Sequence, residues 1–265
     1  MSLGRPSVIK PQPGVSDVPG GFSFVRSVQP VLDRYCIDCH GFGKATAKLD
    51  LRGVIRRRSP AWTDFSESYK ALTGRPGLVK LLQRNQETGT SEEKDYFAHA
   101  GRLGRMLLAG HCPALKADDA SFRVLMTWLD LNVQYFGDYS FSRLEGRGIE
   151  PDGERALREA IAARFGQEVA GQPFDTLVNV AAPERSRVLL MALPERDGGW
   201  GKVTEGAFGG RDDPAWRRLE ALVRGSLQTP PPPRPDGTCG LPKCQCGSCW
   251  VPGAQNRNRT VASGK

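Results

Sequence analysis

The chain has 265 residues, of which 39% are hydrophobic and 25% are charged, and its formal net charge is +8 at pH 7. The length allows one large hydrophobic core or two small ones. No apolar run reaches the roughly 18 residues that a membrane-spanning helix needs, so we expect no membrane span. The densest basic run, at 56–58, lies in no recognised nucleic-acid module, so nucleic acid is not an expected partner. The positive charge fits a solvated surface or steering toward an acidic partner.

Residues 1–21 are rich in proline and glycine and show no hydrophobic periodicity, which predicts a linker or an extended arm. A helix then follows, with Ser27 able to cap it and Pro30 suited to its first turn. Its apolar residues recur at helical spacing at Phe24, Val28, Val31, Leu32 and Tyr35.

This helix leads into Cys36-Ile37-Asp38-Cys39-His40, and C-x-x-C-H is the attachment signature of a c-type haem. Two thiols at this spacing bond to the two vinyl groups of one porphyrin as thioethers, and the adjoining His40 becomes the proximal iron ligand. The alternatives are a structural disulfide, a thioredoxin-like dithiol and half of a zinc site. A redox C-x-x-C should open a helix after an apolar strand, whereas here a helix precedes the motif. We therefore predict one covalent haem c.

Further helices are predicted beyond the motif. A short helix over 66–72 ends at Gly74, and a brief one lies near 78–82 in a stretch, 76–100, that is otherwise expected to be surface loop. A helix over 102–110 is stopped by Gly110 and Pro113. Asp118 or Asp119 caps a longer helix. The apolar stripe of that helix consists of Phe122, Leu125, Met126, Leu129, Val133 and Phe136.

The composition changes after Tyr139. An amphipathic helix is predicted over 154–165, a turn and short helix over 178–190, and a loop over 198–201. Asp212 or Asp213, followed by Pro214, starts a last helix. The inward-facing residues of that helix are Trp216, Leu219, Leu222, Val223 and Leu227.

The predicted fold class is therefore mostly α. We expect a cytochrome c-like helical haem domain at 22–140, after the 1–21 arm, and a second small helical domain at 141–229. The second domain is either a degenerate cytochrome-like unit without haem or another small bundle. Four prolines at 230–233 break regular structure and open an irregular Cys-rich tail at 230–265.

The haem iron needs a sixth ligand or an open site. Candidate side chains are His99, His111, Met106, Met126 and Met191. His111 stands at a helix end between two helices that should pack together, which suits an inward imidazole. His99 lies in a polar stretch and is expected at the surface, and Met126 belongs to an apolar stripe that is more often core. We predict His40 and His111 as the iron ligands, with an open or tyrosine-lined site as the alternative.

The tail carries Cys239, Cys244, Cys246 and Cys249. Four thiolates can hold zinc, but the usual zinc pattern separates two cysteine pairs by a longer loop. Two disulfides are the alternative that we favour, because a c-type haem and seven cysteines point to an oxidising compartment. Cys112 is then the odd thiol, which is buried or paired with the tail or with another chain.

The segment 19–40 resembles the haem domain of proteins related to the hydrazine synthase alpha subunit. The blocks at 68–72, 107–111 and 128–137 fit the same pattern, and 178–186 and 198–201 fit it less sharply. The resemblance covers 19–227. It implies a haem domain that usually follows a β-propeller, with His111 of the Leu-Leu-x-Gly-His segment ligating the iron. This chain has no propeller and no second C-x-x-C-H, so the resemblance implies the domain and its ligands, and not hydrazine synthesis.

We expect electron transfer through a single bis-His haem c, in a part of a larger redox assembly rather than in an enzyme. A catalytic haem subunit acting on small nitrogen compounds and a docking module that retains a haem are the alternatives. The expected partner is a redox protein, acidic if the positive charge steers it, or a separate β-propeller or larger subunit. The haem motif places the chain in the periplasm or another extracytoplasmic compartment. Because residues 1–6 do not form a signal peptide, a signal was removed or the chain is part of a longer product.

The tail yields the first testable prediction. So short a segment cannot bury a core of its own, and each disulfide in it would contribute about 2–4 kcal/mol by limiting the unfolded chain. Thiol counting on the denatured, unreduced holoprotein should therefore find only Cys112 reactive. Four further thiols, together with one zinc per chain by elemental analysis, would make the tail a zinc knuckle instead.

Overall fold

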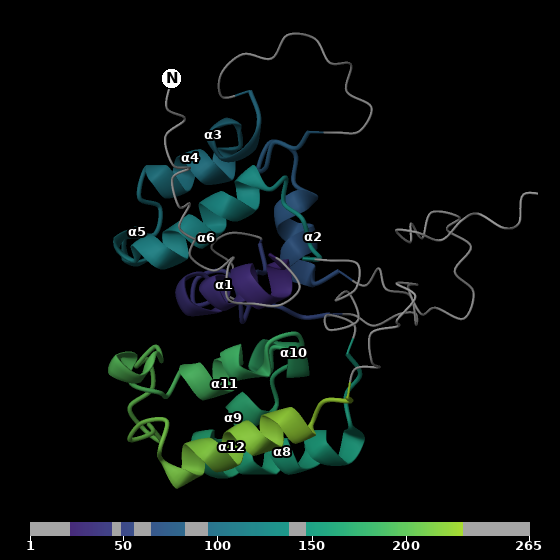
Figure 1. Cartoon of the computed structure of the whole chain (residues 1–265), viewed down its shortest axis with the longest axis vertical. Coiled ribbons are helices and arrows are strands. Elements are labelled where there is room, and N and C mark those ends of the chain that lie inside the picture. Colours follow the sequence, from purple (N-terminus) through teal and green to yellow (C-terminus); the bar gives the residue numbers. More distant parts are fainter. Residues whose placement is uncertain (1–21, 44–48, 56–64, 83–94, 138–146, 230–265) are drawn as a thin grey trace, which may run out of the picture. The chain divides into compact units, whose positions relative to one another are not determined.

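The computed structural model describes residues 22–43, 49–55, 65–82, 95–137 and 147–229. Within these ranges the regular elements are helices, and the β pairing is limited to one isolated bridge between Ile149 and Leu227. The prediction of a mostly α protein is confirmed (Figure 1). Among the same residues, no helix combines the length and the apolar character that a membrane crossing requires. The predicted arm at 1–21 and the tail at 230–265 lie outside the described residues.

The N-terminal helix begins with an unusual wide turn. Residues Phe24–Val28 form a π-helix (η1), which passes directly into the α-helix α1, Gln29–Tyr35. The cap of this helix is Ser23, whose hydroxyl accepts a hydrogen bond from the Arg26 amide at 3.5 Å. The predicted cap at Ser27 is wrong, because the helix starts one turn earlier and Ser27 is buried inside it. Pro30 occupies the first turn of α1 as predicted.

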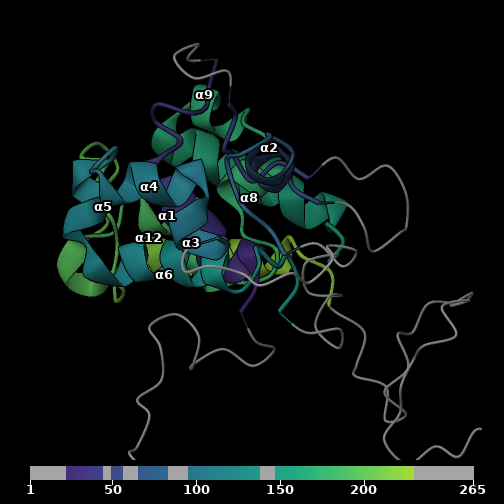
Figure 2. The ribbon, with the colours of Figure 1, turned by 90° about the horizontal axis from the view of Figure 1, so that it is seen from above.

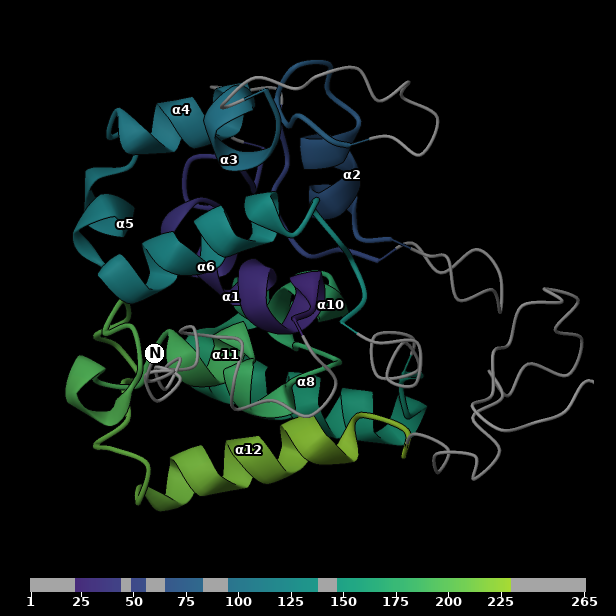
Figure 3. The same ribbon diagram turned by 45° about the horizontal axis from the view of Figure 1, so that its top comes forward.

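A first group of helices follows α1. Its members are α2 (Glu67–Thr73), α3 (Phe97–Ala100), α4 (Arg102–Leu108), α5 (Pro113–Ala117) and α6 (Asp119–Asp130). Helices α3 to α6 are gathered together in Figures 2 and 3. The helices predicted over 66–72 and 102–110 are confirmed, and Asp118 caps α6 by accepting from the Ser121 amide.

Two parts of this group were not anticipated. The brief helix predicted near 78–82 is wrong, because the carbonyls of Leu78 and Lys80 accept hydrogen bonds from the amides of Leu103 and Phe97, at 2.8 and 3.1 Å. Helices α3 and α5 have four and five residues, which is too short for a recognisable apolar period.

A second group of helices occupies 151–225. It consists of α8 (Pro151–Phe165), α9 (Gln167–Ala170), α10 (Phe174–Leu177), η3 (Pro183–Arg185), α11 (Arg187–Leu190), η4 (Glu195–Asp197) and α12 (Pro214–Gly225). Helices α8 and α12 run alongside one another in Figures 1 and 3. Gly153 permits this close approach, since a Cβ there would lie 2.3 Å from the Gly225 carbonyl oxygen. Asp213 caps α12 and Trp216, Leu219 and Val223 are buried, which confirms the last predicted helix.

Aromatic side chains fix the start of the N-terminal helix in the core. The Phe24 ring lies 5.2 Å from the rings of Tyr69 and Trp128 and 5.8 Å from that of Tyr135, measured between centroids. Phe24 and Trp128 are fully buried. These contacts join η1 to α2, to α6 and to the segment after α6, so the helix that leads to the cysteine motif has a rigid base.

The second group of helices completes the hydrogen bonding of the N-terminal helix. Pro30 has no amide hydrogen, and the Gln29 amide bonds to Phe24, so the Val25 carbonyl has no helical donor. The side-chain amide of Asn179 donates to this carbonyl at 2.7 Å. Arg185 donates to the neighbouring Arg26 carbonyl at 3.1 Å. The acceptors on the N-terminal helix and these side-chain donors therefore lie more than a hundred positions apart in the sequence.

Both groups of helices contribute to one hydrophobic core and belong to one compact unit, Met1–Pro230. The domain boundary predicted at 140–141 falls inside this unit, and the one predicted at 229–230 lies at its end. The two stretches expected to be separate domains are thus packed together around α1.

Replacing Asn179 tests this junction. Asn179→Ala leaves the Val25 carbonyl and the amides of Ala181 and Ala182 without their side-chain partner. We expect the free energy of unfolding in urea to fall by about 2–3 kcal/mol, because each buried polar group left unpaired costs about 1–3 kcal/mol. The exposed amide Gln167, replaced by alanine, is the control and should change stability by less than about 0.5 kcal/mol. Equal losses in the two variants would contradict the assigned role of Asn179.

Candidate functional site

The cysteine motif is a turn that continues α1. The amide of Cys36 donates to the Leu32 carbonyl and that of His40 to the Cys36 carbonyl, both at 2.8 Å. Ile37 is fully buried and anchors the turn, whereas Cys39 is exposed and Cys36 and His40 are half-buried. The motif therefore presents one thiol at the surface and holds the other, with the imidazole, against the protein.

His111 is positioned by the end of α4. The Gly110 amide donates to the Leu107 carbonyl and the His111 amide to the Met106 carbonyl, both at 3.0 Å, and Gly110 has a φ of +86°. This is the Schellman arrangement, in which a left-handed glycine closes a helix and fixes the residue after it. Pro113 then starts α5 at once. The glycine and proline that stop the helix therefore also determine where the histidine stands.

The structure brings the two predicted iron ligands together. The ring centroids of His40 and His111 lie 5.9 Å apart, with 48° between the ring planes. A bond from imidazole nitrogen to metal is about 2.0 Å long, so two rings on opposite sides of one iron have centroids about 6 Å apart. The observed separation is therefore close to that of two imidazoles that bind one metal atom.

The surroundings of His40 also favour the form of its side chain that binds a metal. Burial, and next the charge of His111, lower the pKa of His40, which favours the neutral imidazole that binds metals. Its Nδ1 atom is buried and has no hydrogen-bond partner among the described residues. This orphaned nitrogen leaves a polar requirement that a bound group can meet.

The environment of the Cys36 thiol differs from that of a redox-active thiol. Burial raises the pKa of the Cys36 thiol to about 12, with the nearby Cys112 as the next cause. A redox-active C-x-x-C lowers that pKa instead, because the thiolate is its nucleophile. Among the described residues, no three His, Cys, Asp or Glu side chains are grouped so that they could hold a bare metal ion. Cys112 lies beside His111, with its sulfur 3.7 Å from the Tyr35 carbonyl oxygen.

Asp118 joins the two ligand-bearing segments. It caps α6, directly after α5, and its Oδ2 accepts hydrogen bonds from the Tyr35 hydroxyl at 2.7 Å and from Arg34 at 3.4 Å. Tyr35 is the last residue of α1 before the cysteine motif. This contact therefore holds the α4–α5 region, with His111, against the turn that carries His40.

Of the other candidate ligands, Met106 lies in the last turn of α4, where its carbonyl accepts the His111 amide. His99 is exposed on α3, as predicted, and Met126 packs against the core, also as predicted. Met191 is buried in the second group of helices. The tail cysteines Cys239, Cys244, Cys246 and Cys249 lie outside the described residues, so the choice between disulfides and zinc stays a prediction.

Sequence reasoning missed one buried ionisable residue close to the motif. Asp33, one turn before Cys36, is buried and accepts a hydrogen bond from Gln29 at 2.8 Å. The i, i+4 spacing of these two polar residues on an otherwise apolar helix was the available signal.

Comparisons with known proteins add no family to this description. No protein-family model, curated protein or solved structure matches the chain. The resemblance to haem domains related to hydrazine synthase therefore stays a prediction from the motifs.

The Asp118 contact predicts a pH dependence of stability. Partial burial raises the pKa of Asp118, but hydrogen bonds from Tyr35 and Ser121 and the charge of Arg34 outweigh it, so the pKa lies below its usual value. Such a carboxylate stabilises the fold above its unfolded-state pKa of about 4, and the contribution is lost as pH falls through the lower folded pKa.

We expect Asp118→Asn, which retains the cap, to reduce the free energy of unfolding by less than about 1 kcal/mol at neutral pH, the range of partly exposed ion pairs. Urea unfolding between about pH 7 and pH 2 should show this difference shrinking toward zero. Asp119→Asn, at an exposed ion pair with Arg123, is the control. A difference that grows as pH falls would contradict the assignment.

Proposed function

We propose that this protein transfers electrons through one covalently attached haem c, with Cys36 and Cys39 as the attachment residues and His40 and His111 as the axial ligands. The observation that carries the proposal is the approach of the His40 and His111 rings to 5.9 Å. This short distance supports the prediction from the cysteine motif, because His111 belongs to a different part of the chain. His111 was predicted separately, from the helix stop at Gly110 and Pro113.

The chemistry of a bound haem is the one-electron change between ferric and ferrous iron. The residues of this chain would set the conditions for it. His40 and His111 together would saturate the iron and leave no position for a substrate, which favours electron transfer over catalysis. Ile37 and Leu115 are buried and stand next to the two histidine-bearing segments in sequence, so they would help to exclude water from the haem and thereby tune its reduction potential.

The cellular setting follows from the same proposal. Covalent haem attachment belongs to oxidising compartments, so we place the protein in the periplasm or another extracytoplasmic compartment. A redox protein would exchange the electrons, and the net charge of +8 favours one with an acidic surface. The chain would then serve as one part of a larger redox assembly.

The test is the spectrum of the purified protein. Produced in a host with c-type maturation, the chain should carry one haem that survives acid–acetone extraction and is low-spin in both redox states. His111→Ala should give a high-spin haem that binds carbon monoxide. His99→Ala is the matched control, because His99 is exposed on α3, and it should leave the spectrum unchanged.

Other outcomes are equally informative. A colourless protein, or haem that extracts freely, would refute covalent attachment. A wild-type haem that is already high-spin and binds carbon monoxide would favour a catalytic haem subunit acting on small nitrogen compounds. A low-spin haem that no redox partner turns over would favour a docking module.

A further inference from the structure

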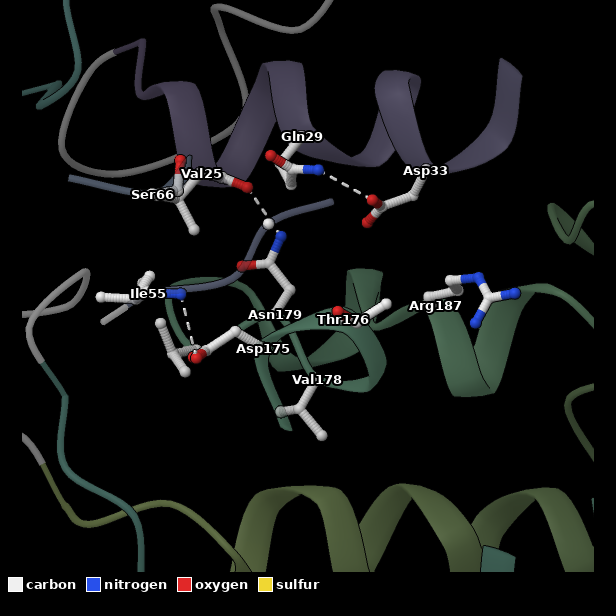
Figure 4. Close-up of a pocket in the computed structure, with 12 residues that line it drawn as sticks. Val25, Gln29, Asp33, Ile55, Ser66, Asp175, Thr176, Val178, Asn179 and Arg187 are labelled. Atoms are coloured by element: carbon white, nitrogen blue, oxygen red, sulfur yellow. Dashed lines mark hydrogen bonds between the residues drawn. The ribbon is translucent and has the colours of Figure 1, made fainter. Parts of the chain in front are cut away.

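A small polar cavity lies between α1 and the α10–α11 segment (Figure 4). Figure 4 shows Gln29 and Asp33 extending from α1 toward it, with Asp175, Thr176 and Arg187 on the opposite side. The space for water centres inside is about 10 Å³. One water molecule needs about 10–15 Å³, so the cavity has room for about one.

Thr176 indicates that this space holds a water. The residue is 1% exposed, it lines the cavity, and its hydroxyl oxygen has no hydrogen-bond partner among the described residues. A buried hydroxyl without a partner is costly, and an ordered water is the usual remedy. The cavity is therefore polar enough to be hydrated and lies beside the Asp33 carboxyl group.

Asp33 itself is poised to change its protonation state. Burial raises the pKa of this carboxyl group to about 7, against the opposing effects of the Gln29 hydrogen bond and the charges of Arg187 and Lys202. Burial likewise lowers the pKa of Arg187. Burial therefore moves the titration of this carboxyl group toward neutral pH.

The other charged groups around Asp33 are already engaged. Lys202 forms an ion pair with Asp38 at 2.6 Å, and Arg52 forms one with Asp50 at 2.6 Å. Asp175, across the cavity, accepts a hydrogen bond from the Ile55 amide at 3.3 Å. Arg187 is the cation that lines the same cavity as Asp33, and its charge and that of Lys202 favour the ionised carboxylate, whereas burial favours the neutral acid.

The position of Asp33 connects it to the haem of the proposed function. Asp33 and Cys36 are three residues apart at the end of α1, so their Cβ atoms lie within about 6 Å on one face. Cys36 would be joined to the porphyrin. At a separation of about 10 Å and an effective dielectric constant of about 20, one unit of charge at the iron changes the proton affinity of a carboxylate about tenfold.

We propose that Asp33 is a redox-coupled proton-binding site. If a donor protein reduced the bound haem, the Asp33 carboxylate would bind a proton from solvent through the cavity water and become a neutral acid. Oxidation by the acceptor protein reverses both steps. The proton offsets part of the added charge, because a tenfold change in affinity gives partial proton uptake near the midpoint of the titration. The inference rests on the proposed function and adds proton uptake to it.

The reduction potential of the holoprotein, measured by spectroelectrochemical titration between about pH 5 and 9, tests the site. Because reduction and proton binding at Asp33 favour each other, the reduction potential should fall with rising pH in a window around pH 7. Asp33→Asn, which retains the Gln29 contact, should be independent of pH in that window. Asp152→Asn, at an exposed carboxylate on α8, should behave as wild type. A dependence retained in Asp33→Asn, or absent from the wild type, would overturn the proposal.

Two further measurements keep the test independent of the folding of Asp33→Asn. On reduction in unbuffered solution near pH 7, the wild-type protein should take up protons, which an indicator dye reports. No uptake would overturn the proposal.

Lys202→Gln removes a cation that lowers the pKa of Asp33, so this variant should move the pH window upward. An unmoved window would count against Asp33. Absence of haem would instead refute the proposed function, and a haem with a pH-independent potential would refute only this inference.

Discussion

The structure depends on an unpaired carbonyl group in its first helix. Pro30 has no amide hydrogen to donate to the Val25 carbonyl, and Asn179 supplies that donor from the second group of helices, where Arg185 also donates to the Arg26 carbonyl. A buried carbonyl that lacks a partner is costly, so η1 and α1 are complete only when both groups of helices have folded. The cysteine motif continues from this helix, so its orientation depends on the whole compact unit.

Two different kinds of contact position the histidines of the candidate haem site. The turn with Cys36 and His40 is a direct continuation of a buried helix, and Ile37 holds it against the core. His111 instead stands in a short segment between two helices, positioned by backbone hydrogen bonds around Gly110 and by the contact of Tyr35 with Asp118. His40 is thus held by the core, and His111 by local backbone geometry together with the long-range contact of Tyr35 with Asp118.

The parts of this arrangement that the sequence predicted are those with local causes. The cysteine spacing, the stop at Gly110, the cap at Asp118 and the start at Pro214 each act within a few residues, and the structure has the corresponding turn or helix end at each. The helix start at Ser23 was missed because the wide turn is stabilised by Asn179, far away in the chain. The burial of Asp33 was missed for the same reason, since it requires α10 and α11 to cover α1.

The distance in sequence between His40 and His111 would affect the stability that a bound group adds to the apoprotein. A group bound by both histidines, and covalently by Cys36 and Cys39, would cross-link two points of the chain and close the long loop between them. Closing a loop removes entropy from the unfolded ensemble, and the effect grows slowly with the length of the loop. Attachment of the haem would then slow local unfolding. The segment with α2 to α4 could separate from α1 only after the bond of the iron to His111 had broken.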